Sequence, residues 1–250
     1  MSLSKLQLEI SRCLDAQIPV DIWWRDDDLV SPSPQFEKLC EITVDLNAPV
    51  LCSIIPKHAS NKLVLNTSDP LIHFCQHGYA HVNHEKDHQL KNEFGQSRAL
   101  DEVKADIQNG QKLLKQLEGS HLESVFVPPW NRFDIGHLPI LEALGFTHIS
   151  CYGFKSYTPT PSNIKFINTH FDITYWGTNQ TYMRPLDEIY VYLAEIIKEY
   201  YLRYSQTKES EPIGILSHHR VLKDGDFFML KELLGTLQNT LGVKFAAPFL

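Results

Sequence analysis

The sequence contains no cysteine pattern of the kind that organises a fold. Its five cysteines are scattered, and no two have the CxxC spacing of a metal or redox motif. An odd, scattered set of thiols is typical of a reducing compartment rather than of a disulfide framework. Most have apolar neighbours, so we expect burial in the core for this set, which consists of Cys13, Cys40, Cys52, Cys75 and Cys151.

Long apolar runs and clusters of positive charge are also missing. No stretch approaches the roughly 20 apolar residues that span a bilayer. Residues 3–14 (LSKLQLEISRCL) have the period of an amphipathic helix rather than the apolar core of a signal peptide. We therefore expect a cytoplasmic protein with no membrane partner. The net charge of −7 argues against nucleic acid as a partner, because phosphate binding needs clustered Lys and Arg.

No linker rich in Pro, Gly or Ser divides the chain, and it has no internal repeat, so we expect residues 1–250 to form one domain. Apolar runs predict strands at 20–24, 49–56, 71–77, 124–128, 146–150, 163–170 and 212–219. Helical periodicity predicts helices at 34–46, 97–119, 137–145, 186–204 and 226–238. This alternation predicts an α/β fold of parallel strands with helices outside, either a closed barrel or a doubly wound sheet.

Polar side chains follow four of the predicted strands at their carboxyl ends. These are the three aspartates at 26–28, then His77, the PPW sequence at 128–130, and His218. In α/β barrels and open sheets, the carboxyl ends of the strands form the rim that carries ligand sites. The sequence therefore predicts a functional site on this rim.

Three adjacent carboxylates repel one another, by about 4 kcal/mol for two charges 4 Å apart at an effective dielectric of 20. A positive partner is therefore expected beside them. A purely structural explanation is also open: Asp28 could cap a helix beginning in SPSPQF, while Asp26 pairs with Arg25 or Arg132.

His77 and His81 are four residues apart, which places them on one face if the segment is helical. Two neutral imidazoles and one carboxylate can hold a divalent metal and leave positions open for water and substrate. The histidine spacing continues to His84. A solvated helix face carrying the same spacing is the alternative.

Two further motifs could take part in catalysis. In VPPW (127–130) two prolines break the strand, so the amide of Trp130 could serve as an oxyanion donor. His218 in ILSHHR (215–220) could be a general acid, because the pKa of imidazole lies near neutrality. The alternatives are a rigid loop with the tryptophan in the core, and a core histidine bonded to a backbone carbonyl.

Five motifs in chain order read RDDDL, HGYAH, VPPW, FDITYW and LSH. They resemble the motifs TFDDG, H-[ST]-x-x-H, R-x-P-[YF], D-x-x-[DS]-W and L-x-H of the polysaccharide deacetylases of the NodB-homology type, carbohydrate esterase family 4. The resemblance spans roughly residues 20–220. It implies an irregular (β/α)7-type barrel and the metal-dependent removal of acyl groups from carbohydrate.

The resemblance also implies a ligand set and a base. His77 and His81 would bind the metal together with the second aspartate of a pair, and the first aspartate of the pair would activate water. The pair is either Asp26 with Asp27 or Asp27 with Asp28. Divergent members with an R-x-D-D pattern favour the second register, which makes Asp27 the base and Asp28 the ligand.

The remaining motifs carry over in the same way. Trp130 would line the oxyanion hole and His218 would be the acid. Asp172 and Trp176 would orient the acid and shape the pocket, while His219 falls where a carboxylate is common. Further contacts to substrate are expected from charged and aromatic residues of these motifs, namely Arg25, Trp24, Trp176, Arg132 and Asp26.

Several departures from the family pattern are evident. The glycine after the aspartate pair is missing, and Asp28 or Leu29 stands in its place. Val127 stands where the family has an arginine that tunes the base, so Arg25 or Arg132 would have to take its place. Gly78 replaces the Ser or Thr of the second motif.

The prediction is thus a hydrolase that binds one divalent metal and deacetylates an N- or O-acylated carbohydrate. Zinc is the default metal, with nickel, cobalt and iron as alternatives. Other possibilities are an amidohydrolase of a small cytosolic metabolite and a non-catalytic carbohydrate-binding relative. A cysteine hydrolase is disfavoured, because the flanks of Cys75 predict burial and its side chain is expected to point away from His77.

Overall fold

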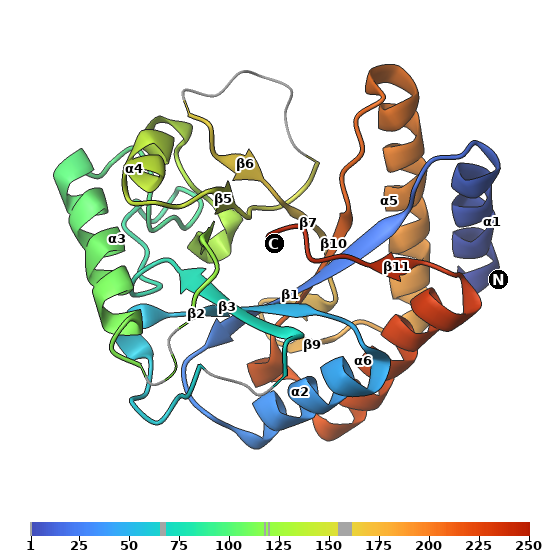
Figure 1. The fold of residues 1–250 in the computed structure, drawn as a ribbon, viewed down its shortest axis with the longest axis horizontal. Helices are drawn as coiled ribbons and strands as arrows, with labels where there is room; N and C mark the ends of the chain where they lie inside the picture. The colour runs from blue at the N-terminus through green and yellow to red at the C-terminus, as the bar shows by residue number, and fades with distance from the viewer. Residues whose placement is uncertain (1, 66–68, 118, 120, 155–161) are drawn as a thin grey trace.

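The computed structural model describes residues 2–65, 69–117, 119, 121–154 and 162–250. Its centre is a curled parallel sheet in the order β6, β5, β4, β3, β2, β1, β10 and β7 (Figure 1). The strands are β1 (Asp21–Leu29), β2 (Val50–Ile54), β3 (Ile72–His77), β4 (Val125–Val127), β5 (His148–Ile149), β6 (Lys165–Phe166), β7 (Thr169–Asp172) and β10 (Ile213–Ser217). The short β11 (Lys244–Phe245) also pairs with β1, while β8 (Thr174–Trp176) and β9 (Thr181–Met183) form a separate hairpin.

The curled sheet meets itself beyond the end of β5. Thr169 in β7 donates its N–H to the carbonyl of Cys151 at 3.0 Å and accepts a hydrogen bond from the amide of Gly153 at 2.7 Å. The path from β5 through β1 to β7 therefore forms a ring of seven strands. The predicted α/β fold with an irregular (β/α)7-type barrel is confirmed, and the doubly wound alternative is wrong.

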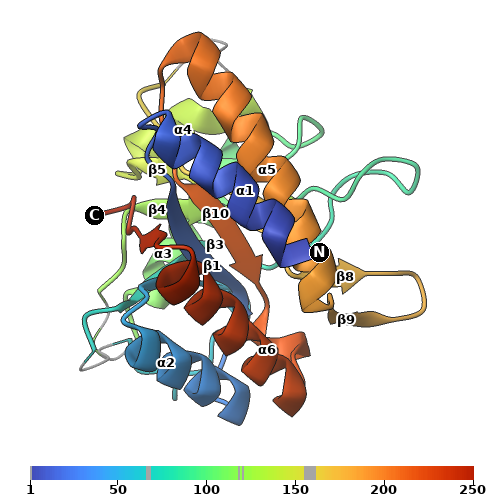
Figure 2. The same cartoon turned by 90° about the vertical axis from the view of Figure 1, so that its right-hand side faces the viewer.

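In the residues that the structure describes, six α-helices surround the sheet, namely α1 (Ser2–Asp15), α2 (Pro34–Leu46), α3 (Leu100–Leu114), α4 (Leu138–Ala143), α5 (Leu186–Thr207) and α6 (Asp224–Gly235). Shorter helical turns lie at Pro56–His58, Pro129–Asn131, Ile135–His137, His219–Val221 and Thr236–Thr240. Figure 2 shows α1 lying along α5, and α2 beside α6. In the described part of the chain, no helix is long and apolar enough to cross a membrane.

Alternation along β1 separates the interior of the barrel from the helical layer, because successive strand side chains point to opposite faces. Trp23 belongs to the small cluster inside the ring, together with Leu51, Cys75, Val125, Val127 and Phe249. Trp24 belongs to the large cluster between sheet and helices. Phe249 packs on Trp23 and on His73, at the amino-terminal end of the barrel. The carboxyl end of the barrel is therefore left for the site.

Most predicted elements are present, and the differences have local causes. The predicted helix at 34–46 is α2, and Ser33 caps it by accepting the amide of Phe36 at 3.1 Å. Asp28 is therefore not the cap that the structural explanation required. The first strand runs to Leu29 and so contains all three aspartates. The segment 163–170 forms parts of two strands, β6 and β7. One predicted helical residue, 118, lies outside the described residues.

Candidate active site

A cavity of about 370 Å³ opens at the carboxyl end of the barrel. Its lining combines acids, imidazoles, two indoles, an amide and a guanidinium, from Asp27, Asp28, His77, His81, Trp130, Asn131, Arg132, Asp172, Trp176 and His218. The structure thus brings together groups that follow different strands, as the rim prediction required. His84 is exposed and is not among the lining residues.

The Asp28 carboxylate and the imidazoles of His77 and His81 form a compact cluster in this cavity. Asp28 Oδ1 lies 3.3 Å from His77 Nε2 and 3.6 Å from His81 Nε2. One oxygen or nitrogen from each of the three residues lies within 4.8 Å of the others. The arrangement matches the predicted ligand set, although the helical face expected for the two histidines is wrong. His77 ends β3, and His81 lies in an irregular loop with φ of 57°.

A bulge in β1 brings Asp28 into the cavity. In the pairing with β2, Asp26 lies opposite Cys52, but the next pair is Leu29 with Ile54. The extra residue in β1 disrupts the alternation, and Asp28 takes a left-handed φ of 72°. Both Asp27 and Asp28 can therefore face the cavity, which a regular strand would forbid.

Hydrogen bonding leaves this cluster suited to a cation. The carbonyl of Val127 can only accept, so the 3.0 Å contact to His77 Nδ1 places the proton there and leaves the Nε2 lone pair facing Asp28. Within the described chain, Asp28 Oδ1 is buried and has no hydrogen-bond donor. Burial raises the pKa of Asp28, but the positive charge that the neighbouring imidazoles carry when protonated outweighs this and holds it below its usual range. An ionised carboxylate and two imidazole nitrogens fit a divalent metal such as zinc.

The loop that carries His81 is held by Glu93, whose side chain is fully buried. The carboxylate of Glu93 accepts the amide of Ala80 at 2.7 Å and that of Tyr79 at 3.1 Å. Gly78 has a φ of 52°, and a Cβ added there would lie 2.3 Å from Glu93 Oε2. The same Cβ would lie 2.5 Å from Cδ of Pro129, so the left-handed backbone, Glu93 and Pro129 together favour glycine in place of Ser or Thr. No motif in the sequence pointed to this carboxylate.

Asp27 points into the barrel and is tightly held. It accepts hydrogen bonds from Arg25 Nη2 at 2.9 Å and from Ser53 Oγ at 2.7 Å. Arg25 is fully buried and also donates to Ser150 Oγ at 2.6 Å and to the side chain of Asn131. Burial raises the pKa of Asp27, but the Arg25 guanidinium and nearby imidazoles bring it below its usual value. Asp27 is thus an ionised carboxylate at the cavity.

Of the two arginines proposed to compensate for Val127, Arg25 is the one that contacts Asp27. Arg132 instead lines the cavity and donates to the carbonyl of Lys91 at 3.0 Å. Because Arg25 is completely buried behind Asp27 and does not line the cavity, it supports that carboxylate rather than touching substrate. The expectation of a direct substrate contact from Arg25 is wrong.

Asp26 and Trp24 face the helical layer instead of the cavity. Asp26 accepts hydrogen bonds from Ser217 Oγ at 2.6 Å, from the amide of His219 at 2.9 Å and from the imidazole Nδ1 of His219. Trp24 donates to the same Ser217 hydroxyl at 2.9 Å. Both residues are completely buried and absent from the cavity lining. The substrate contacts expected of them are wrong, because strand alternation turns them outward.

His218, Asp172 and Trp176 form the opposite wall of the cavity. His218 Nδ1 lies 3.7 Å from Asp172 Oδ1, which is too long for a hydrogen bond. Asp172 accepts the indole N–H of Trp176 at 2.7 Å and the amide of Thr174 at 2.8 Å. Burial raises the pKa of Asp172 above its usual value, against the opposing influence of His218. The indole of Trp176 also meets the His218 ring edge-on, with centroids 4.8 Å apart.

Trp130 lies at the cavity rather than in the core. It follows two prolines and has a left-handed φ of 56°. Its ring centroid lies 4.5 Å from that of His81. The alternative of a core tryptophan is therefore wrong.

The sequence motifs did not reveal the polar side chains that hydrogen-bond to Asp27 and Arg25. Ser53 and Leu51 occupy alternate positions of β2, and Leu51 lies inside the barrel. A serine at an inward position near the end of a strand could therefore have been recognised in the sequence as a residue of the site. Asn131 and Ser150 carry no such signal, because only the fold brings them to Arg25.

The cysteines do not contribute a nucleophile. Cys75 shares the inner face of β3 with His77, since the two are two residues apart, so the expectation that it points away from His77 is wrong. It is nevertheless fully buried, and burial together with Asp27 raises the pKa of its thiol well above the usual value.

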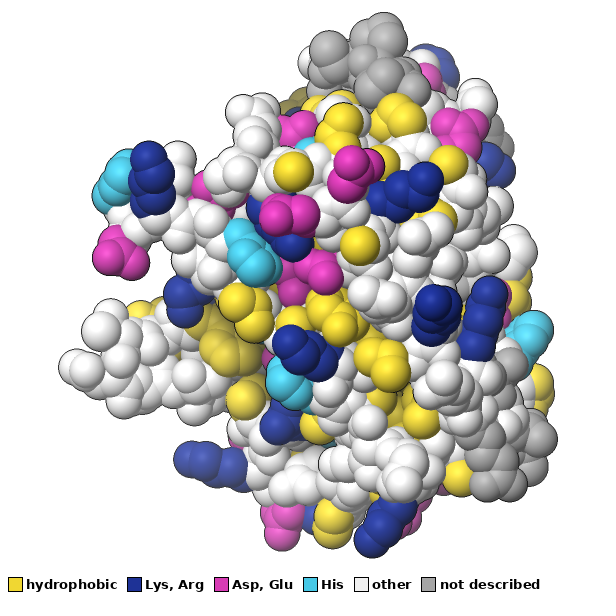
Figure 3. Space-filling model, turned by 90° about the vertical axis from the view of Figure 1, so that its left-hand side faces the viewer, with side chains coloured by type: hydrophobic (Ala, Val, Ile, Leu, Met, Phe, Trp, Pro, Cys, Tyr) yellow, Lys and Arg dark blue, Asp and Glu magenta, His cyan; other side chains and the backbone are white. Residues whose placement is uncertain are grey.

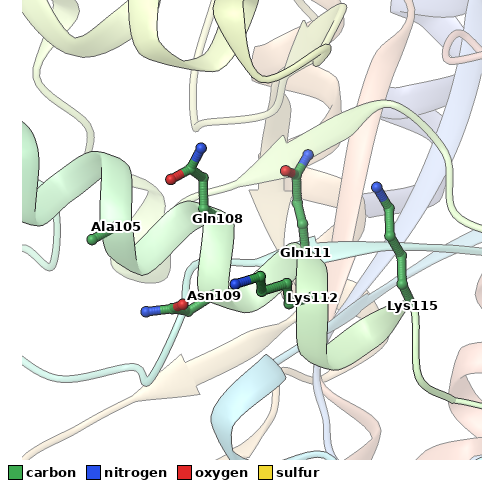
Figure 4. A pocket seen from close by; sticks show the side chains of 6 residues that line it. All are labelled: Ala105, Gln108, Asn109, Gln111, Lys112 and Lys115. Atoms are coloured by element: carbon green, nitrogen blue, oxygen red, sulfur yellow. The ribbon is translucent and has the colours of Figure 1, made fainter.

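A second hollow, of about 320 Å³, lies along α3 (Figure 4). Amide and lysine side chains line it, from Ala105, Gln108, Asn109, Gln111, Lys112 and Lys115. Among the described residues, its lining contains no carboxylate or imidazole.

No family model matches the sequence, and no curated protein matches it. Solved structures match in fold. A family 4 carbohydrate esterase from Streptomyces lividans in complex with acetate is 11% identical with a TM-score of 0.52, over 89% of this chain and 90% of its own. The Bc1960 peptidoglycan N-acetylglucosamine deacetylase is 12% identical with a TM-score of 0.53, over 91% and 86%.

A third match, BA3943 from Bacillus anthracis, is described as a pseudoenzyme of the same carbohydrate esterase family. It is 12% identical with a TM-score of 0.55, over 90% of this chain and 63% of its own. The resemblance to polysaccharide deacetylases is thus confirmed for the fold. Since a fold does not imply an activity, the function has to be argued from the site.

Proposed function

We propose that the protein is a divalent-metal-dependent hydrolase that removes an acyl group from an N- or O-acylated carbohydrate. The observation that best supports this proposal is the cluster of Asp28, His77 and His81, in which a carboxylate oxygen without a donor among the described residues lies close to two imidazole nitrogens. The cluster lines a cavity large enough for a sugar. Two imidazoles and one carboxylate suit zinc, with nickel, cobalt and iron as alternatives. The deacetylase fold supports an acylated sugar as substrate.

Each of the surrounding groups has a part in such a reaction. A divalent cation held by the three ligands would lower the pKa of water and polarise the acyl carbonyl. Asp27, kept ionised by Arg25, would accept the proton of the attacking water. The backbone amide of Trp130 would donate to the carbonyl oxygen as negative charge develops on it. His218 would donate a proton to the nitrogen or oxygen that leaves.

Asp172 and Trp176 would position this acid and the sugar. Asp172 is itself fixed by two hydrogen bonds, so its charge stays beside His218. The side chain of Trp176 is 52% exposed and presents an aromatic face on which a sugar ring can pack.

The test begins with the metal. Purified protein is incubated with zinc, dialysed and analysed by inductively coupled plasma mass spectrometry beside His77→Ala. We expect about one ion per chain in the wild type and none in the variant, since the variant loses one of three ligands. Absence of metal from the wild type after incubation with zinc, nickel and cobalt would overturn the proposal.

Acetate release from a panel of acetylated sugars then tests the reaction. We expect release that a chelator abolishes and zinc restores. Asp27→Asn should keep the metal and lower kcat by about 10² to 10⁴. Bound metal without release from any sugar would favour a non-catalytic carbohydrate-binding protein. Release from small acylated metabolites alone would favour the amidohydrolase alternative.

A further inference from the structure

The arginines of this chain differ in whether they have a carboxylate partner. Five of the seven arginines have a carboxylate partner, in the pairs Arg12–Glu9, Arg25–Asp27, Arg98–Asp106, Arg184–Glu188 and Arg203–Glu199. Among the described residues, Arg132 and Arg220 have none. Arg132 lines the cavity, and Arg220 Nη1 lies 3.5 Å from the carbonyl oxygen of Asp28. Both arginines without an acid partner among the described residues thus lie beside the candidate active site.

Arg132 is held in place without being neutralised. Its guanidinium donates to the carbonyl of Lys91 at 3.0 Å, which fixes its position and leaves its charge uncompensated. The ammonium of Lys91 lies 6.0 Å from the centre of the Trp130 ring and has no ion pair in the described part of the chain. In a chain of net charge −7, positive groups without partners at one opening indicate a negatively charged ligand.

The acids of the cavity do not compete for these cations. Asp27 is paired with Arg25, and Asp28 lies between two imidazoles. Asp172 accepts the indole N–H of Trp176. Among the described residues, no acid of the cavity is therefore available to Arg132, which leaves its guanidinium free to bind an anionic group of a ligand.

The lining of the cavity includes both an aromatic residue, Trp176, and a cationic residue, Arg132. Figure 2 shows two projections on one side of the molecule, the β8–β9 hairpin and the segment before α3, and Figure 3 shows a notch between them. Trp176 ends the first strand of the hairpin. Arg132 is joined to Lys91, which belongs to the other projection. A ring that packs on Trp176 would therefore present its substituents towards Arg132.

We propose that the substrate is an acylated sugar that carries an anionic group, a carboxylate or a phosphate, bound by Arg132 with support from Lys91 and Arg220. This inference rests on the proposed function for the reaction, while the binding of the anion can be measured without turnover. The planar guanidinium suits two-point contact with either anion.

The kinetic test uses three acetylated sugars with the zinc-loaded protein: N-acetylglucosamine, N-acetylmuramic acid and N-acetylglucosamine 6-phosphate. We expect kcat/KM for one or both anionic sugars to exceed that for the neutral sugar by about tenfold or more, as a charge-assisted hydrogen bond provides. Arg132→Gln should remove this advantage, so that the anionic and neutral sugars are hydrolysed with similar kcat/KM. Arg12→Gln is the matched control, because Arg12 belongs to α1 and its guanidinium packs on Tyr201 of α5 rather than lining the cavity.

The anionic sugars separate the two chemistries, since a preference for the muramic acid indicates a carboxylate and a preference for the sugar phosphate indicates a phosphate. Equal rates for all three sugars, unaffected by Arg132→Gln, would overturn the inference and leave the proposed function standing. If no sugar is hydrolysed, calorimetric titration decides. Binding of an anionic sugar that Arg132→Gln abolishes would support the inference, and equal or absent binding in wild type and variant would overturn it.

Discussion

Asp26 and Asp28 are two residues apart in β1, and each carboxylate faces an imidazole, yet their surroundings are opposite. Asp26 accepts hydrogen bonds from Ser217 and His219 and is completely buried. Asp28 Oδ1 has no donor among the described residues and lies beside two imidazoles at a cavity. A buried acceptor without a donor costs about 1 to 3 kcal/mol. The first cluster is therefore complete within the protein, whereas the second is incomplete without a ligand.

The largest expected difference is in the amount of bound zinc when Asp26 and Asp28 are each replaced by asparagine. Asp28→Asn removes the carboxylate of the proposed ligand set, so we expect complete loss of stoichiometric zinc. Asp26→Asn leaves all three ligands in place and should retain about one ion per chain. Elemental analysis after dialysis measures both. Equal metal content in the two variants would erase the distinction between the clusters.

For the stability of the metal-free protein we expect the opposite order, with the larger loss in the Asp26 variant. Asp26→Asn replaces a charged acceptor that three donors surround, so we expect it to lower the free energy of unfolding by about 3 kcal/mol. Asp28→Asn breaks no hydrogen bond from a donor and should cost less than about 1 kcal/mol. Urea denaturation in the presence of a chelator gives both values. A larger loss for Asp28→Asn would contradict the assignment of the structural role to Asp26.

A smaller effect is expected from the loop that completes the Asp28 cluster. In Gly78→Ala the new Cβ would lie 2.3 Å from Glu93 Oε2 and 2.5 Å from Pro129 Cδ, so we expect the loop that carries His81 to shift. We expect zinc affinity to fall about tenfold, as for other groups that orient a ligand. Competition with a chromophoric chelator measures the affinity. Gly225→Ala is the control, because its Cβ would have nothing within 4 Å, and an equal loss there would contradict the role of Glu93.

The smallest effect concerns the thiol of Cys52, which lies opposite Asp26 in the pairing of β1 with β2. Burial, with Asp26 contributing, raises the pKa of Cys52 well above its usual value. The thiolate is the reactive form, and Cys52 is completely buried. We expect no labelling of Cys52 by a disulfide reagent in the folded wild type or in Asp26→Asn, because burial remains. Rapid labelling of the native variant would show that removing Asp26 opens the core.

Much of the site was predictable because strand ends are local features of a sequence. Runs of apolar residues placed His77, Trp130 and His218 after strands, and all three line the cavity. The register of the aspartates was harder, since three identical residues give no pattern. Trp23 and Trp24 are adjacent and both apolar, so they do not indicate which aspartate turns outward, and the bulge after Asp26 has no sign in the residues themselves.

The sequence by itself determined the order of strands and helices, the polar groups at the carboxyl rim and the types of ligand available, because these depend on periodicity and composition. The tertiary structure decided which carboxylate each imidazole meets. Arg25 reaches Ser150 across the barrel, Glu93 shapes the loop of His81, and His219 satisfies Asp26. Each of these contacts joins residues far apart in the chain or at a break in regular geometry, where local propensity carries no information about the partner.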